Sequence, residues 1–201
     1  SEDVEKDPVW SLTEGRRATV ENAKKAADMG VDMIILTGNP GIGVSNHAIV
    51  HALNELKAAV GDRVILTAGK MHAAGVISEG GENILTENDV DAFIDAGADI
   101  LLLPAPGTVP GITMEYAHKL IARAHAKGAL AMTTIGTSQE GADEATIREI
   151  ALMCKMAGAD IHHIGDSGYM GMAIPDNITA YSIAIRGKRH TYRRMAMSLL
   201  R

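Results

Sequence analysis

The chain has 201 residues, of which 46% are hydrophobic and 22% charged, so it can fold as one domain with a substantial core. That balance excludes a mainly disordered chain. With 25 acidic against 19 basic side chains, the net charge of −6 argues against a dedicated nucleic-acid binder.

Cysteine content and hydropathy indicate where such a chain works. The single cysteine, Cys154, cannot form an internal disulfide, which is typical of a reducing compartment. No apolar run reaches the roughly 18 residues of a membrane span. Residues 1–12 form an acidic lead without the apolar segment of a signal peptide. We therefore expect a cytoplasmic protein, in contact with neither membrane nor nucleic acid, with a single βα-repeat domain over 13–201.

One pattern recurs roughly every 30 residues: an Ala-rich amphipathic stretch, a glycine, and a short apolar run. The marker glycines are Gly30, Gly61, Gly97, Gly128 and Gly158. A glycine in this position is typical of the C-terminal cap of a helix, and the run after it of a parallel strand buried on both faces. The repeat length is that of a βα unit.

In chain order, the pattern predicts helices over 13–29, 45–59, 87–96, 113–127 and 143–157. It predicts strands over 31–36, 63–67, 99–103, 129–133 and 160–164, and two closing helices over 176–185 and 187–200. Thr86, Thr113 and Asp143 are the residue types expected to cap three of the helix starts.

Five parallel strands fit two architectures. The favoured one is a (β/α) TIM-type barrel, incomplete or atypically closed in this chain, because a full barrel takes eight units and about 250 residues. The first predicted helix has no strand before it, which agrees with this choice. The alternative is an open doubly wound parallel sheet.

In both architectures ligands bind in the loops after the carboxyl ends of the strands, so polar residues there are candidates. The first such loop offers Thr37, Asn39, Gly41 and Gly43. Closely spaced glycines before a helix let backbone N–H groups face a phosphate or carboxylate. The alternative is a tight turn capped by Ser45.

The second loop offers Gly69, Lys70 and His72. Lys70 could act as a cation or a Schiff-base amine, and His72 as a general base. The alternative is a solvent-exposed lysine and a surface histidine.

The fourth loop is rich in hydroxyl groups and carries one carboxylate. Gly136, Thr137 and Ser138 could bind phosphate or sugar oxygens, and Glu140 could act as a general base or a metal ligand. The alternative is ordinary loop composition.

Two consecutive histidines in the last predicted strand are the strongest candidates for site chemistry. Alternation turns one side chain toward the barrel axis and the other toward the helices. We assign the acid/base role to His163, oriented by Asp166, with Gly168 in the loop beyond. The alternative for each histidine is a core residue satisfied by hydrogen bonds.

No organic cofactor motif is present, and Mg²⁺ is the candidate ion, with Glu140 and Asp166 as candidate ligands.

The C-terminal stretch 186–201 carries six basic residues and no acidic one. On an otherwise acidic chain such a tail could dock on a neighbouring copy, which predicts a homo-oligomer. A solvated helix face is the alternative.

Three runs carry a family resemblance. They are Gly15-Arg16-Arg17-Ala18-Thr19 with Glu21-Asn22, Leu36-Thr37-Gly38-Asn39-Pro40-Gly41, and Ala68-Gly69-Lys70-Met71-His72. From about Gly15 to the C-terminus the chain resembles a bacterial barrel family whose members are often labelled phosphoenolpyruvate phosphonomutase or haloacid dehalogenase-like hydrolase. The resemblance implies a barrel fold. A dehalogenase-like reaction would need an Asp nucleophile at a strand end, and a mutase more acidic residues around Mg²⁺ than Glu140 and Asp166.

These observations predict an enzyme that acts on a small phosphorylated or carboxylated metabolite. Lys70 would stabilise charge, Glu140 and His163 would form an acid/base pair, and Asp166 would orient the histidine or bind Mg²⁺. Lyase, isomerase and hydrolase reactions all remain open. The alternative is a non-catalytic protein that binds a metabolite or builds an oligomer.

Overall fold

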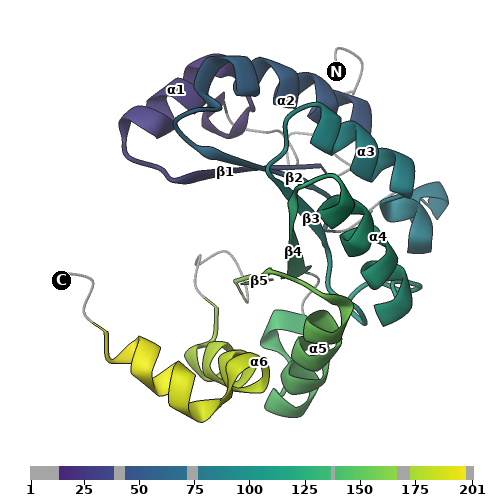
Figure 1. Ribbon diagram of the computed structural model, residues 1–201, viewed down its shortest axis with the longest axis vertical. Coiled ribbons are helices and arrows are strands. Elements are labelled where there is room, and N and C mark those ends of the chain that lie inside the picture. The colour runs from purple at the N-terminus through teal and green to yellow at the C-terminus, as the bar shows by residue number, and fades with distance from the viewer. Residues whose placement is uncertain (1–13, 39–43, 72–76, 137–138, 167–172, 198–201) are drawn as a thin grey trace.

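The structure is a computed structural model that describes residues 14–38, 44–71, 77–136, 139–166 and 173–197 (Figure 1). Its strands are β1 (Met33–Thr37), β2 (Ile65–Gly69), β3 (Ile100–Pro104), β4 (Leu130–Ile135) and β5 (Ile161–Ile164). Its α-helices are α1 (Val20–Asp28), α2 (Asn46–Val60), α3 (Glu87–Asp95), α4 (Met114–Ala126), α5 (Glu144–Ala157) and α6 (Pro175–Met195). Short 3₁₀ turns are η1 (Glu14–Arg16), η3 (Ile77–Glu79), η4 (Gly81–Ile84) and η5 (Gln139–Gly141).

The strands form one parallel sheet in the order β1-β2-β3-β4-β5. This order has no reversal, so it is the order of a (β/α) barrel rather than of a doubly wound sheet. Figure 1 shows the sheet curved into an arc with the helices along its convex side. Within the described ranges β1 and β5 lie at opposite edges, so the sheet is open. The predicted incomplete barrel is confirmed as a half-barrel.

The main core lies between the convex face of the sheet and helices α1 to α4. Leu36, Leu66, Leu101 and Leu103 point into it from the strands. A smaller core joins the end of β4 to α5 and α6 and includes Ile135, Ile147, Ala151 and Tyr181. Burial on both faces holds throughout β3 but is wrong for the edge strands. β1 and β5 are only partly buried, because each has a neighbouring strand on one side only.

Four of the five marker glycines adopt the left-handed conformation expected after a helix. They are Gly30 (φ 86°), Gly97 (φ 106°), Gly128 (φ 83°) and Gly158 (φ 97°). Gly61 is the exception, with φ −62°. There the chain leaves α2 through a further turn, in which the Val64 N–H donates to the Val60 carbonyl at 3.2 Å, so no left-handed residue is needed.

The predicted helix over 13–29 is wrong in its first part. Only Glu14–Arg16 forms a 3₁₀ turn, and α1 begins at Val20, capped by Thr19. The Asn22 side chain holds the two segments together by donating to the Glu14 and Arg17 carbonyls.

The other predicted helix boundaries are close to the observed ones. The capping residues Thr86, Thr113 and Asp143 are confirmed, each accepting a backbone N–H at its helix start. The two closing helices are confirmed as two helical segments within α6, which meet at Gly187, where the backbone is non-helical with φ 77°.

Candidate functional site

A cavity of about 400 Å³ opens at the carboxyl ends of β4 and β5. It is lined by Met71, Gly136, Glu140, His163, Ile164, Gly165, Asp166 and Ala173. Four of the predicted site residues are in this set: Gly136 and Glu140 follow β4, His163 lies near the end of β5, and Asp166 follows β5. The cavity therefore lies at the edge of the sheet where the sequence predicts ligand binding.

His163 reaches the cavity because of strand alternation. It pairs in register with Thr134 of β4 and shares the concave face of the sheet with it. Burial lowers the pKa of His163 below its ordinary value of 6.5, and the nearby Asp166 and Glu140 carboxylates partly oppose that shift. The imidazole is consequently neutral at pH 7. Its Nδ1 is buried and has no hydrogen-bond partner within the part of the chain that the structure describes.

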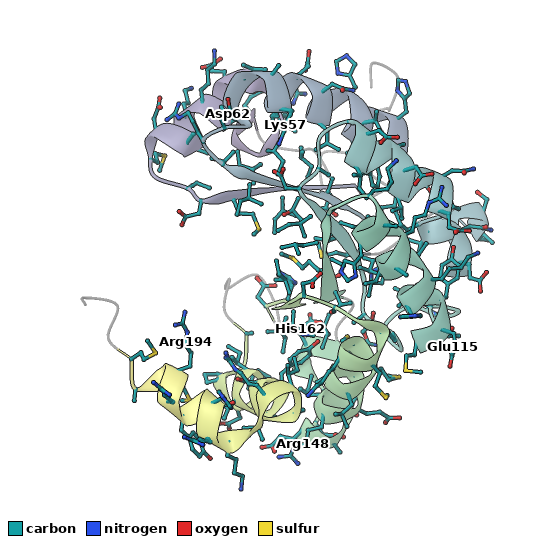
Figure 2. All side chains as sticks on the ribbon, viewed as in Figure 1. Lys57, Asp62, Glu115, Arg148, His162 and Arg194 are labelled. Atoms are coloured by element: carbon teal, nitrogen blue, oxygen red, sulfur yellow. The ribbon has the colours of Figure 1, made fainter. Side chains whose placement is uncertain are left out.

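His162 points the opposite way, between β5 and the helices α5 and α6 (Figure 2). Its Nδ1 lies 3.2 Å from the Tyr181 hydroxyl and 3.5 Å from that of Thr133. Burial lowers the pKa of His162 and raises that of Tyr181, so both groups are neutral at pH 7 and share a hydrogen bond whose donor is set by the imidazole tautomer. His162 is thus the hydrogen-bonded core histidine, the alternative reading for one of the pair.

Glu140 lies in η5 and is only 9% exposed. Its Oε2 is buried without a hydrogen-bond partner among the residues described. Gly165 borders it, and a Cβ built at Gly165 would lie 3.9 Å from the Glu140 carboxyl carbon and 3.0 Å from the Ile135 carbonyl oxygen. A glycine at this position therefore leaves open the space beside the carboxylate.

Lys70 follows β2 and is 1% exposed, which excludes the solvent-exposed alternative. Its neighbour Met71 lines the cavity, but Lys70 itself does not. Gly69 has a packing role in addition to any ligand role, because a Cβ there would come within 1.7 Å of the Leu102 carbonyl oxygen. Thr37 is exposed at the end of β1, the strand at the opposite edge of the sheet from β5.

The remaining candidates lie outside the described residues. They are Asn39, Gly41, Gly43, His72, Thr137, Ser138 and Gly168. The cap that the alternative reading of the first loop requires is present, since the Ser45 hydroxyl accepts the Ala48 N–H.

The residue that sequence reasoning missed is Asn177. It is 4% exposed on α6, and its side-chain amide donates to the carbonyls of Glu140 and Ala142 at 2.8 and 2.9 Å. Asn177 lies at helical spacing from the apolar residues Ala180 and Tyr181, and this position on the apolar face of a helix could have identified it in the sequence. Such a buried amide must have partners, but the sequence does not say which.

Within the described residues, no group of three or more His, Cys, Asp or Glu side chains lies close enough to hold an ion. Glu140 and Asp166 are the two carboxylates that line the cavity. Mg²⁺ held by two carboxylates takes the rest of its octahedral shell from water or substrate oxygens, and we derive no chemical step through a metal.

A second cavity, of about 430 Å³, lies at the amino ends of the strands near Asp62 (Figure 2). One of its lining carboxylates, Asp99, is engaged by Lys57 at 2.9 Å and by the Leu66 N–H. Since parallel α/β folds bind ligands at the other edge, this cavity is not the site.

No helix in the described part of the chain is long and apolar enough to cross a membrane.

The chain belongs to a protein family described as Domain of unknown function (DUF7916), whose model matches residues 1–201. No curated protein matches the sequence significantly.

Several solved structures share the fold at low sequence identity. A provisionally named lyase/mutase from Burkholderia cenocepacia J2315 has a TM-score of 0.61 and 15% identity, over 85% of this chain and 63% of that one. A provisionally named deoxyribose-phosphate aldolase from Coccidioides immitis has a TM-score of 0.60 and 12% identity, over 87% and 62%. QR15, described as an aldolase, has a TM-score of 0.63 and 11% identity, over 88% and 74%.

These similarities establish the fold. The chain spans about three fifths of the length of the first two structures. The comparisons agree with the barrel fold that the family resemblance implied, and they give no support to the phosphonomutase or dehalogenase labels.

Proposed function

We propose that this protein is an enzyme that moves a proton on a small carboxylated or phosphorylated metabolite, with His163 and Glu140 as its acid/base pair. One observation carries the proposal. His163 Nδ1 and Glu140 Oε2 are both buried without a hydrogen-bond partner in the described structure, and both residues line one cavity. Leaving a buried polar group unpaired costs about 1–3 kcal/mol, which a bound ligand would repay.

The charges around His163 suit a general base. Its depressed pKa leaves the imidazole neutral and able to accept a proton at pH 7. The imidazolium that forms is then favoured by Asp166 and Glu140, whose carboxylates act on His163 in that direction. The pair resembles the usual arrangement in which one group removes a proton and a second returns it elsewhere on the substrate.

Within this class we favour a lyase. The base takes the proton of a substrate hydroxyl, and the O–H electron pair forms a new C=O bond while the neighbouring C–C bond breaks. The electron pair of the broken bond is held as an enolate, which then takes up a proton to give the second product. The names of the similar structures, a lyase/mutase and two aldolases, support this choice. Lys70 is buried at the end of β2 and does not line the cavity, so any stabilisation of the substrate or enolate charge that we propose for it acts through its electric field and not through contact.

The test begins with a thermal-shift screen of the full chain against small carboxylated and phosphorylated metabolites. A ligand at about 100 times its Kd stabilises the fold by roughly 2.7 kcal/mol, which is readily detected. Compounds that bind are then incubated in D₂O with the protein, and incorporation of deuterium or cleavage is followed by NMR.

We expect His163→Gln and Glu140→Gln each to abolish exchange and cleavage. Glu149→Gln, an exposed carboxylate on α5, is the matched control and should leave both unchanged. Exchange that survives in both site variants would overturn the proposed pair. Tight binding with no exchange in the unmodified protein would favour the alternative of a non-catalytic metabolite-binding protein.

A further inference from the structure

One helix contacts both segments that carry the acid/base pair. From α6, Asn177 donates both of its side-chain hydrogen bonds to the turn that holds Glu140, one to the Glu140 carbonyl at 2.8 Å and one to the Ala142 carbonyl at 2.9 Å. The amide is 4% exposed, so water does not compete for these bonds. The backbone of η5 is thereby fixed at the residue whose carboxylate lines the cavity.

The second contact is made by Tyr181, which is 5% exposed. Its hydroxyl lies 3.2 Å from His162 Nδ1, and the two rings pack at 5.5 Å between centroids with a tilt of 59°. His162 precedes His163 on β5, and successive strand side chains point to opposite faces. Holding His162 against α6 therefore keeps His163 turned into the cavity.

Asn177 and Tyr181 are four residues apart on α6, so they lie one above the other on the same helix face. We propose that these two residues position Glu140 and His163 relative to each other, so that α6 sets the geometry of the pair. This inference rests on the proposed function for its catalytic meaning. Its structural content, the placement of Glu140 beside His163, can be tested without a substrate.

A purely structural role for Asn177 would attach α6 to the rest of the protein without changing the surroundings of His163. The two roles differ in the titration of that imidazole. Asp166 and Glu140 are the charged groups whose carboxylates raise its pKa against the effect of burial. Moving Glu140 away should lower the pKa of His163, as removing the carboxylate charge would.

The experiment follows the imidazole signals of the full chain by NMR between pH 4 and 8, with a chelator present and without substrate. The variants are Asn177→Ala, Glu140→Gln and the double variant, with Thr179→Ala as control. Thr179 is also on α6, but its hydroxyl donates to the Pro175 carbonyl within the same helix.

We expect Asn177→Ala to lower the pKa of His163 by most of the shift that Glu140→Gln causes. In the double variant the shift should equal that of Glu140→Gln alone, because the two changes act through the same carboxylate. Thr179→Ala should cause no shift. An unchanged titration in Asn177→Ala, or additive shifts in the double variant, would overturn the inference.

Two further variants keep the inference open to refutation if Asn177→Ala fails to fold. Asn177→Ser is polar, but its hydroxyl is too short to reach the carbonyls of Glu140 and Ala142, so it should lower the pKa of His163 as Asn177→Ala does. Tyr181→Phe keeps the ring but removes the hydroxyl that contacts His162. It should change the titration of His162 and reduce the effect of Glu140→Gln on His163, because His162 then holds the neighbouring His163 less firmly. Equal His163 titrations in Asn177→Ser and the unmodified protein would count against the proposed positioning.

The outcomes separate this inference from the proposed function. Coupled titration without exchange in any metabolite would support the positioning role and count against the enzyme. Exchange that depends on His163 and Glu140, with no change of titration in the Asn177 variants, would support the enzyme and overturn the positioning role.

Discussion

Replacing Glu140 by methionine should make the protein more stable. The side chain is 9% exposed, and its Oε2 is buried without a hydrogen-bond partner within the described ranges. Methionine has a similar length and volume but no polar atom that needs a partner. A residue kept for chemistry rather than for folding commonly costs stability in this way.

The magnitude follows from the unpaired oxygen. Removing an unsatisfied buried polar group recovers about 1–3 kcal/mol. For a chain of this size each 1 kcal/mol raises Tm by about 2–4 °C, so Glu140→Met should melt about 2–12 °C higher. Urea unfolding followed by circular dichroism measures the free energy directly, and an unchanged m-value would show that the two states are otherwise the same.

Glu149→Met provides the matched control, since that carboxylate is exposed on α5 and its replacement should change stability by less than about 0.5 kcal/mol. The reasoning would be refuted if Glu140→Met destabilised the fold by more than about 1 kcal/mol while Glu149→Met did not. Glu140 would then be a residue that holds the loop together through its carboxylate.

Two other predictions concern the sheet. Burial lowers the pKa values of His162 and His163 below 6.5 in the folded state, so the unfolded chain binds more protons as the pH falls. The free energy of unfolding should therefore be retained above pH 6.5 and decrease as the pH drops below it. The midpoints of urea unfolding at each pH would record this decrease. Gly69→Ala should lose about 3 kcal/mol or more, because its Cβ would come within 1.7 Å of the Leu102 carbonyl oxygen. In a melting assay, Gly15→Ala is the control, with no atom within 4 Å of the added Cβ.

The strands could be predicted because two local signals coincide at each of them. A glycine that ends a helix in the left-handed conformation comes before an apolar run, as at Gly97 and Gly158. The start of α1 could not be predicted in the same way. Residues 14–18 have helical composition, but the Asn22 side chain bonds to the carbonyls of Glu14 and Arg17 and so stabilises a turn. That competition depends on the conformation of the loop, which composition does not reveal.

The candidate site could be predicted in part for a related reason. Strand alternation and the position of strand ends bring His163, Asp166 and Glu140 to one cavity, and both rules can be read from the sequence. The contribution of Asn177 could not, because its partners lie 37 and 35 residues away. A contact of that range depends on where α6 packs, and this follows from the whole fold.

The concave face of the half-barrel supports the role of general base that we propose for His163. Met132 and Ile161 lie two residues below Thr134 and His163 on the same face of β4 and β5, and they pack in one apolar cluster with Met71. Met71 also lines the cavity, so apolar side chains border the cavity on this face of the sheet. Burial desolvates the ring and lowers its pKa, whereas the carboxylates beside it limit the shift. Burial thus keeps the imidazole of His163 neutral at pH 7, and the carboxylates of Asp166 and Glu140 leave it able to take up a proton.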